Sequence, residues 1–300
     1  MTQPRVIDYE GSRYSAEFWN SSREYEDRAE RLALAAMLPP RGRRIVEIGA
    51  GAGRLGGLYL GYDEIVLMDY ARSTVLEARA RWGHDSRFKF VAADVYRLPF
   101  DAASLDSVVM VRVIHHLVDV PRALRQIRET LRPGGVFILE FANKRNLKSM
   151  LRFALRRQAW SPYTREPVEF AELNFDFHPD WMRERVREAG FDIRRQRSVS
   201  LFRVAALKRW VGPRRLAAIE APLQAPLAPA ALSPSVFLQC AAPPAQGDQL
   251  DLRAAPGLFK CPACGSSELD QQPQALLCPN GHRWALVDGV YDFRMSQTQT

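Results

Sequence analysis

The residues with the clearest chemical potential lie in a glycine-rich turn. The stretch "VEIGAGAGRL" (46–55) places Gly49, Gly51 and Gly53 directly after a predicted buried strand. Glycines at such a turn let the backbone approach a ligand closely, because no side chain stands in the way. Gly51, Gly53 and Gly56 also match the spacing of a dinucleotide fingerprint. The turn alone therefore leaves two ligands open, a nicotinamide dinucleotide and S-adenosylmethionine.

Two aspartates that follow the next predicted strands discriminate between these ligands. Asp69 ends "EIVLMD", where it can bind the ribose of either ligand. Asp94 ends "FKFVAAD", where it can accept the adenine amino group while the N–H of Val95 meets a ring nitrogen. A nicotinamide enzyme has no evident use for this second acid, so the pair favours S-adenosylmethionine. The alternative for each aspartate is a plain role in capping a turn or a helix.

The elements that must position these residues alternate along the chain. Five strand-like segments, "RRIVEIG", "EIVLMD", "FKFVAAD", "LDSVVMVRV" and "GGVFILEFA", are separated by helix-like segments such as "ARSTVLEARARW" and "VPRALRQIRETL". This alternation predicts a parallel sheet covered by helices on both faces. A helix in "SREYEDRAERLALAAML" precedes them, with Ser21 or Ser22 as its cap. After an insertion at 144–177 we expect a helix in "HPDWMRERVREAGF", a sixth strand in "FDIRRQRSVSLFR" and a last strand in "PSVFLQCAAP".

The ordered motifs "VEIGAGAGRL", "VLMDYA" and "VAADVYRLPFDAASLDSVVMVRVIHHLVDVPRALRQIRETLRPGGVFIL" resemble the class I S-adenosylmethionine-dependent methyltransferases, in particular the type 11 branch. The resemblance covers roughly residues 15–243. It implies an α/β fold with a doubly wound, mostly parallel, Rossmann-like sheet of seven strands, the last one antiparallel. It also implies S-adenosylmethionine as cofactor. The residues that it places around the cofactor are Glu47, Gly49, Gly51, Gly53, Asp69, Tyr70, Asp94 and Val95.

The segment "VRVIHHLVDV" after the fourth strand carries the candidates for the catalytic step. Methyl transfer from a sulfonium needs a nucleophile held in line and, for some acceptors, removal of a proton. The resemblance places this segment at the mouth of the site, which makes Arg112, His115 and His116 candidates for acceptor contact or for the base. The alternative is that the histidines only cap or pack. Glu140, at the end of the fifth strand, is a further candidate.

Two methyltransferase chemistries lack their residues in this sequence. The Asn/Asp-Pro-Pro-aromatic tetrad that common exocyclic-amine nucleic-acid methyltransferases carry is absent after the fourth strand. The single cysteine before the C-terminal region, Cys240, falls in the last strand, where we expect an inert buried thiol rather than a nucleophile for pyrimidine methylation.

The insertion at 144–177 is strongly basic. From Phe141 to Arg165 there is no acid, and Lys148, Arg152 and Arg156 recur at helical spacing with apolar residues between them. Basic residues interleaved with aromatics suit a nucleic acid, and a basic amphipathic helix suits an anionic membrane. A lid helix with a solvated basic face is the plain alternative. Tyr14, Phe18 and Trp19 are expected in the same cover.

The C-terminal region carries a metal-site pattern. "CPACG" and "CPNGH" supply Cys261, Cys264, Cys278 and His282, the spacing of a closed tetrahedral zinc site. Gly265 and Gly281 are expected to allow the tight turns. The segment "LLCPNGHRWALVDGVYDF" resembles the zinc ribbons that activate translation-related methyltransferases. The resemblance implies a structural zinc and recruitment of a partner or substrate.

Composition sets the remaining expectations. The net charge of +8 favours an anionic partner, and the chain lacks both an apolar signal segment and a run long enough to span a membrane. We expect a cytoplasmic protein with a methyltransferase domain at 1–243, a linker at 244–256 and a zinc ribbon at 257–294. The leading hypothesis is a methyltransferase acting on RNA or a translation-related protein through the basic lid and the ribbon. The alternatives are a small-molecule or quinone-type methyltransferase and a non-catalytic S-adenosylmethionine-binding scaffold.

Overall fold

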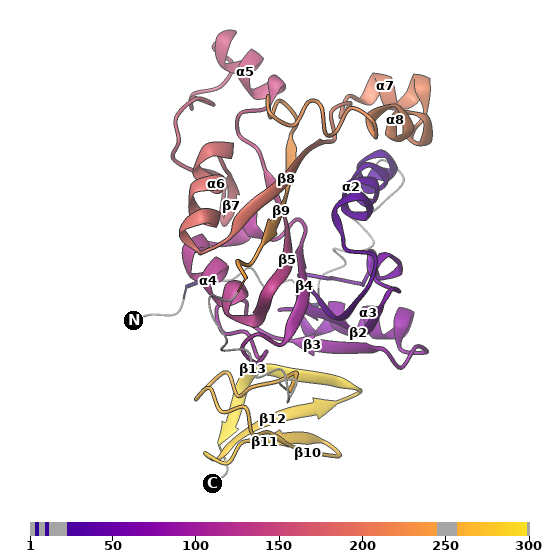
Figure 1. Cartoon of the computed structure of the whole chain (residues 1–300). Helices are drawn as coiled ribbons and strands as arrows, with labels where there is room; N and C mark the ends of the chain where they lie inside the picture. Colours follow the sequence, from indigo (N-terminus) through magenta and orange to yellow (C-terminus); the bar gives the residue numbers. More distant parts are fainter. Residues whose placement is uncertain (1–3, 6–9, 12–22, 245–256, 299–300) are drawn as a thin grey trace.

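A mixed sheet of eleven strands forms the centre of this computed structural model, which describes residues 4–5, 10–11, 23–244 and 257–298 (Figure 1). Seven of the strands form the sheet that the sequence predicted. Their spatial order is β3 (Phe88–Ala92), β2 (Tyr62–Asp69), β1 (Gly42–Ile48), β4 (Leu105–Met110), β5 (Leu131–Ala142), β9 (Ser235–Ala241) and β8 (Asp192–Val199). The strands from β3 to β5 pair in parallel, whereas β9 is antiparallel to both β5 and β8. The expected Rossmann-like α/β fold with an antiparallel last strand is therefore confirmed.

Helices cover both faces of this sheet. One hydrophobic cluster joins the sheet to α2 (Glu24–Met37), α3 (Arg72–Trp82) and α8 (Pro213–Glu220), and the other joins it to α4 (Val120–Thr130) and α6 (Pro179–Glu188). The apolar strands are buried on both sides for this reason, as parallel strands between helices require. The short α7 (Ala205–Val211) precedes α8, and a 3-10 turn, η2 (Gly56–Leu58), follows the glycine-rich turn.

The first described helix begins later than its predicted cap. Arg23 is the N-cap of α2 and makes no capping hydrogen bond, while three acids lie in the first turn. Acidic side chains there are stabilised by the positive end of the helix dipole. The predicted cap residues, Ser21 and Ser22, lie outside the described residues, as do Tyr14, Phe18 and Trp19.

The insertion after β5 contains the helix α5 (Leu147–Ala154) and a hairpin of β6 (Val168–Ala171) and β7 (Asn174–Asp176). The side chain of Asn146 caps α5 by accepting the N–H of Ser149. The expectation of three basic residues on one face of this helix is wrong in one respect. Arg156 lies beyond the end of α5 with a φ of 57°, so Lys148 and Arg152 alone belong to the helix.

The C-terminal strands continue the same sheet. They are β10 (Asp270–Gln272), β11 (Ala275–Leu277), β12 (His282–Val287) and β13 (Val290–Thr298), each antiparallel to the next. β13 pairs in parallel with β3, in the register Val290 to Phe90 (Figure 1). Phe259 stacks on Phe100 with ring centroids 6.0 Å apart, so aromatic packing reinforces the junction. Among the described residues, no helix is long and apolar enough to cross a membrane.

Candidate active site and metal site

The turn after β1 owes its shape to glycine. Gly49, Gly51 and Gly53 have φ values of 74°, 52° and 67°, a left-handed conformation that strains other residues. A Cβ on Gly49 would lie 2.0 Å from Val113 Cγ2, so no side chain fits there. A Cβ on Gly51 would meet no atom within 4 Å. The backbone at Gly51 is therefore open on the side to which a Cβ would point.

Asp69 ties the end of β2 to this turn. Its carboxylate accepts the N–H of Gly51 at 2.8 Å and the N–H of Ala71 at 3.1 Å. The indole N–H of Trp82 holds the other side of the turn by donating to the carbonyl of Gly53 at 2.8 Å. These hydrogen bonds give Asp69 the turn-capping role that the sequence left open as the alternative to ligand binding.

Three residues expected around the cofactor, Asp94, Val95 and Tyr70, follow the neighbouring strands β3 and β2. Asp94 is buried after β3, and its carboxylate accepts the N–H of Tyr96 at 2.9 Å. This hydrogen bond is the turn-capping role that the sequence left as the alternative. Val95 is buried beside it. Tyr70 follows β2, and its carbonyl lies 3.4 Å from a guanidinium nitrogen of Arg294 in β13. The C-terminal strand β13 therefore contacts the backbone of the segment that follows β2.

Glu47 is a buried carboxyl group beneath the turn. Burial raises its pKa to about 8, although the guanidinium groups of Arg54 and Arg31 act in the opposite direction. The Tyr59 hydroxyl faces this carboxyl. Within the described chain, one oxygen of Glu47 and the Tyr59 hydroxyl have no partner in hydrogen-bond geometry. Burial therefore favours the neutral, protonated form of Glu47.

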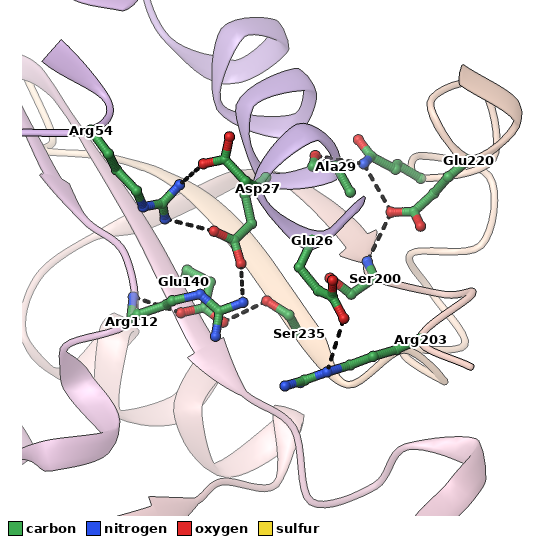
Figure 2. A network of polar contacts seen from close by, with 12 residues as sticks. Glu26, Asp27, Ala29, Arg54, Arg112, Glu140, Ser200, Arg203, Glu220 and Ser235 are labelled. Atoms are coloured by element: carbon green, nitrogen blue, oxygen red, sulfur yellow. Dashed lines mark hydrogen bonds and ion pairs between the residues drawn. The ribbon is translucent and has the colours of Figure 1, made fainter. Parts of the chain in front are cut away.

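Arg112 is the centre of a buried polar network at the carboxyl ends of β4 and β5 (Figure 2). Its backbone, with a φ of 61°, donates an N–H to Glu140 at 2.8 Å, and its guanidinium pairs with Glu30 of α2. Arg54 pairs with Glu30 and Asp27 at 2.6 Å each. Burial alone would raise the pKa of Glu30, but the two guanidinium groups lower it below its usual value. The ion pair of Arg112 with Glu30 positions α2 against the sheet. Because a guanidinium keeps its proton, Arg112 is excluded as a base.

His115 and His116 lie in a 3-10 turn, η3 (Ile114–His116), with ring centroids 4.1 Å apart. Burial lowers the pKa of both, and for His115 the neighbouring His116 and Arg112 add to the effect. His116 Nδ1 lies 3.1 Å from the carbonyl oxygen of Leu173 in the β6–β7 hairpin. Both imidazoles are therefore neutral at pH 7, the form that accepts a proton.

Asp176 is a candidate site residue that the sequence did not reveal. It ends β7, which packs against η3 and β5. Burial raises its pKa to about 6, Arg203 and Lys144 act to lower it, and Glu140 raises it further. Lys144 is itself buried and donates to the Thr164 hydroxyl at 2.9 Å. No motif marks Asp176, because it lies in an irregular insertion.

The C-terminal residues predicted to bind metal do lie together. The ligand atoms of Cys261, Cys264, Cys278 and His282 all lie within 4.8 Å of one another. Gly265 and Gly281 have φ values of 79° and 81°, as the predicted tight turns require. Three thiols and one imidazole in a cluster of this size suit a tetrahedral zinc ion.

The hydrogen bonds around this cluster also suit a metal ion. The Asn280 side chain donates to Cys264 Sγ, which lowers the pKa of that thiol to about 6 and favours the thiolate that metals bind. The Trp284 indole donates to Cys261 Sγ at 3.4 Å. Among the described residues, the buried Nδ1 of His282 has no hydrogen-bond partner, so it is available as a ligand.

A groove of about 630 Å³ lies elsewhere, between the C-terminal strands and the methyltransferase sheet. It is lined by Arg79, by Phe88 at the start of β3, and by Val287 at the end of β12. Since the start of β3 lies at the opposite end of that strand from Asp94, this groove is separate from the candidate active site.

Comparison with known proteins agrees with this geometry. Residues 46–139 match the family model described as "Methyltransferase domain". This segment runs from β1 into β5 and includes the glycine turn, both aspartates and η3. The chain carries a class I S-adenosylmethionine-dependent methyltransferase domain.

Curated relatives and solved structures share this domain. A demethylmenaquinone methyltransferase from Clavibacter sepedonicus is 32% identical over 109 residues, covering 36% of this chain and 44% of the relative. A probable S-adenosylmethionine-dependent methyltransferase from Mycolicibacterium smegmatis is 28% identical over 216 residues, covering 71% and 76%. The chain spans about half the length of the first curated relatives it matches. A chain from the complex between the Haloferax volcanii Trm112 methyltransferase activator and a methyltransferase shares the fold, with a TM-score of 0.53, 21% identity, and 77% and 96% of the two chains covered.

Proposed function

We propose that this protein transfers the methyl group of S-adenosylmethionine to a small-molecule acceptor. The observation that carries the proposal is the glycine turn, whose left-handed backbone is open at Gly51 and is held by the carboxylate of Asp69. This arrangement lies inside the segment that matches the methyltransferase family. The residues proposed to hold the cofactor are Glu47, Gly49, Gly51, Gly53, Asp69, Tyr70, Asp94 and Val95.

The relatives favour a small acceptor over a macromolecule. They include methyltransferases of demethylmenaquinone and of a rifamycin, which are small molecules. The sequence had favoured RNA or a translation-related protein, on the basic charge and the ribbon. The comparisons support the small-molecule alternative better than that main hypothesis.

The chemistry asked of the chain's own residues is limited. When bound, S-adenosylmethionine supplies an activated methyl group. The turn and Asp69 hold the donor, and the ion pairs of Arg112 and Arg54 with Glu30 hold α2 over the carboxyl ends of β4 and β5. For an acceptor that carries a proton, the candidate bases are the imidazoles of His115 and His116 and the carboxylate of Asp176. His115 is the weakest of the three, because burial lowers its pKa well below the ordinary value for an imidazole.

The C-terminal strands are proposed to be a structural zinc ribbon that stabilises the methyltransferase domain. Zinc bound by the Cys261, Cys264, Cys278 and His282 set would fold a segment too small to fold on apolar burial alone. β13 covers the edge of β3, which would otherwise expose unpaired backbone groups. The resemblance of this segment to methyltransferase-activator ribbons supports the same role within one chain.

Transfer of a tritiated methyl group tests the proposed function. The protein is incubated with labelled S-adenosylmethionine and a cell lysate that is separated into small-molecule and lipid, RNA, and protein fractions. We expect the label in the small-molecule and lipid fraction. The Asp69→Ala variant should not transfer label, whereas Asp63→Ala should transfer it as the wild type does, because Asp63 is exposed near the other end of the same strand. Label confined to RNA or protein would contradict the small-molecule proposal, and cofactor binding without transfer would indicate the scaffold alternative.

A further inference from the structure

The positive charge of the chain is concentrated in two segments. Residues 141–165 and 201–219 together contain twelve lysines and arginines and no aspartate or glutamate. The rest of the chain has thirty basic and 34 acidic residues, so it is slightly acidic. The two segments contain α5 and α7, and the second also reaches most of α8. The net charge of +8 therefore arises from these two surface segments.

The helix α5 exposes an apolar stripe beside its basic residues. Leu147, Leu151 and Leu155 recur every four residues, and they are 62%, 58% and 54% exposed. Lys148 and Arg152 are exposed at the positions that follow two of these leucines. The side of the helix that faces the protein presents the buried Ser149 and the half-buried Met150 and Phe153. A soluble helix normally turns its leucines inward, so this orientation indicates an apolar contact outside the chain.

A second helix has the same character. Trp210 in α7 is 88% exposed, next to the exposed Arg209, and Leu207 is also exposed. Arg215 in α8 adds an exposed charge. In Figure 1, α5, α7 and α8 all lie at the end of the molecule away from the C-terminal strands.

We propose that α5 and α7 dock this protein onto an anionic membrane surface. Helices that lie in a membrane interface combine leucine and tryptophan on one face with lysine and arginine on the next, and acidic lipid headgroups complement the positive charge. Exposed aliphatic side chains have no counterpart in the phosphate contacts and base stacking of a nucleic acid. The leucine stripe therefore favours a lipid surface over RNA.

The position of this docking surface relates it to the candidate active site. β5 and β8 are both antiparallel to β9, so their carboxyl ends share one edge of the sheet. α5 follows β5 and α7 follows β8 from this edge, which also holds Arg112 and Glu140. Docking through the two helices would bring the site close to an acceptor dissolved in the membrane. Vesicle binding itself does not depend on the proposed methyl transfer.

Co-sedimentation with vesicles tests the inference without any cofactor. The full chain is mixed with vesicles of phosphatidylcholine containing phosphatidylglycerol, and with vesicles of phosphatidylcholine alone. We expect binding to the anionic vesicles that weakens as salt is raised. Lys148→Gln with Arg152→Gln should reduce partitioning about 25-fold, at about fivefold for each charge. Leu147→Gln with Leu151→Gln should reduce it at least about tenfold.

Control variants at the other end of the molecule test whether binding depends on this surface in particular, or only on the total charge and hydrophobicity of the protein. Arg41→Gln with Arg43→Gln removes two exposed charges at the opposite end of the sheet, and Leu60→Gln removes an exposed leucine there. Both should bind vesicles as the wild type does. Circular dichroism and thermal melting confirm that every variant is folded. An absence of vesicle binding would overturn the proposal. A second outcome would also overturn it: vesicle binding unchanged by the two leucine substitutions, together with binding to a single-stranded RNA oligonucleotide. That result would indicate a nucleic-acid surface.

Discussion

Replacing Glu47 with glutamine should change how the stability of this protein depends on pH. Burial raises the pKa of Glu47 from 4.5 to about 8. Between those values the unfolded chain has lost the proton while the folded chain keeps it. The free energy of unfolding therefore falls as pH rises, by about 1.4 kcal/mol per pH unit at most. From pH 5.5 to 7.5 this amounts to a loss of at most about 2.7 kcal/mol in the wild type. Glutamine has the same shape and no proton to lose, so Glu47→Gln should not show this loss.

Urea denaturation of both proteins at pH 5.5, 6.5 and 7.5 measures the effect. Other groups titrate equally in the two proteins, so the difference in free energy of unfolding isolates Glu47. We expect the free energy of unfolding of Glu47→Gln, relative to that of the wild type, to rise by at least about 1 kcal/mol from pH 5.5 to pH 7.5. Glu268→Gln, a change at an exposed carboxyl, should show no such trend. If the free energy of unfolding of the variant relative to the wild type stays constant or falls as pH rises, Glu47 is ionised in the folded protein. The argument from burial would then be wrong.

Three further predictions concern the cofactor, the base and the metal. Asp69→Ala removes the acceptor of the Gly51 N–H and the acceptor proposed for the ribose hydroxyls. Calorimetry should therefore show that S-adenosylmethionine binds more weakly by about 2 kcal/mol. Unchanged affinity would contradict the assignment. If Asp176 removes a proton, the methyl-transfer rate should rise with pH through about 6, and Asp176→Asn should lower the rate and abolish that rise; a variant that retains the wild-type profile would exclude this role. Cys261→Ser should release a zinc ion and lower the melting temperature of the chain, because β13 shares the sheet with β3; elemental analysis that finds no zinc in the wild type would refute the metal assignment.

Much of the methyltransferase domain was predictable because its signals are local. The strand β1 has the apolar residues Ile45, Val46 and Ile48 just before the turn, and the turn needs glycines because its φ values are positive. The regular alternation of apolar runs with helices predicted the fold class, and the family resemblance implied the antiparallel last strand, β9. The cysteine and histidine cluster was equally predictable, since its ligands lie in two short turns whose spacing is characteristic. In each case the chemistry and the residues that position it lie within a few positions of one another.

The tertiary structure alone decided which distant residues meet. Glu30 pairs with Arg112, which is 82 positions away in the sequence. The β6–β7 hairpin brings Asp176 near Lys144 and Arg203, and no sequence motif predicts this hairpin. The same holds for β13, because the resemblance of its segment to a zinc ribbon does not imply the edge of β3 as its partner. An ion pair or a strand pairing of this kind depends on the relative placement of whole elements. That placement is determined by the packing of the entire core, and no single segment of the sequence encodes it.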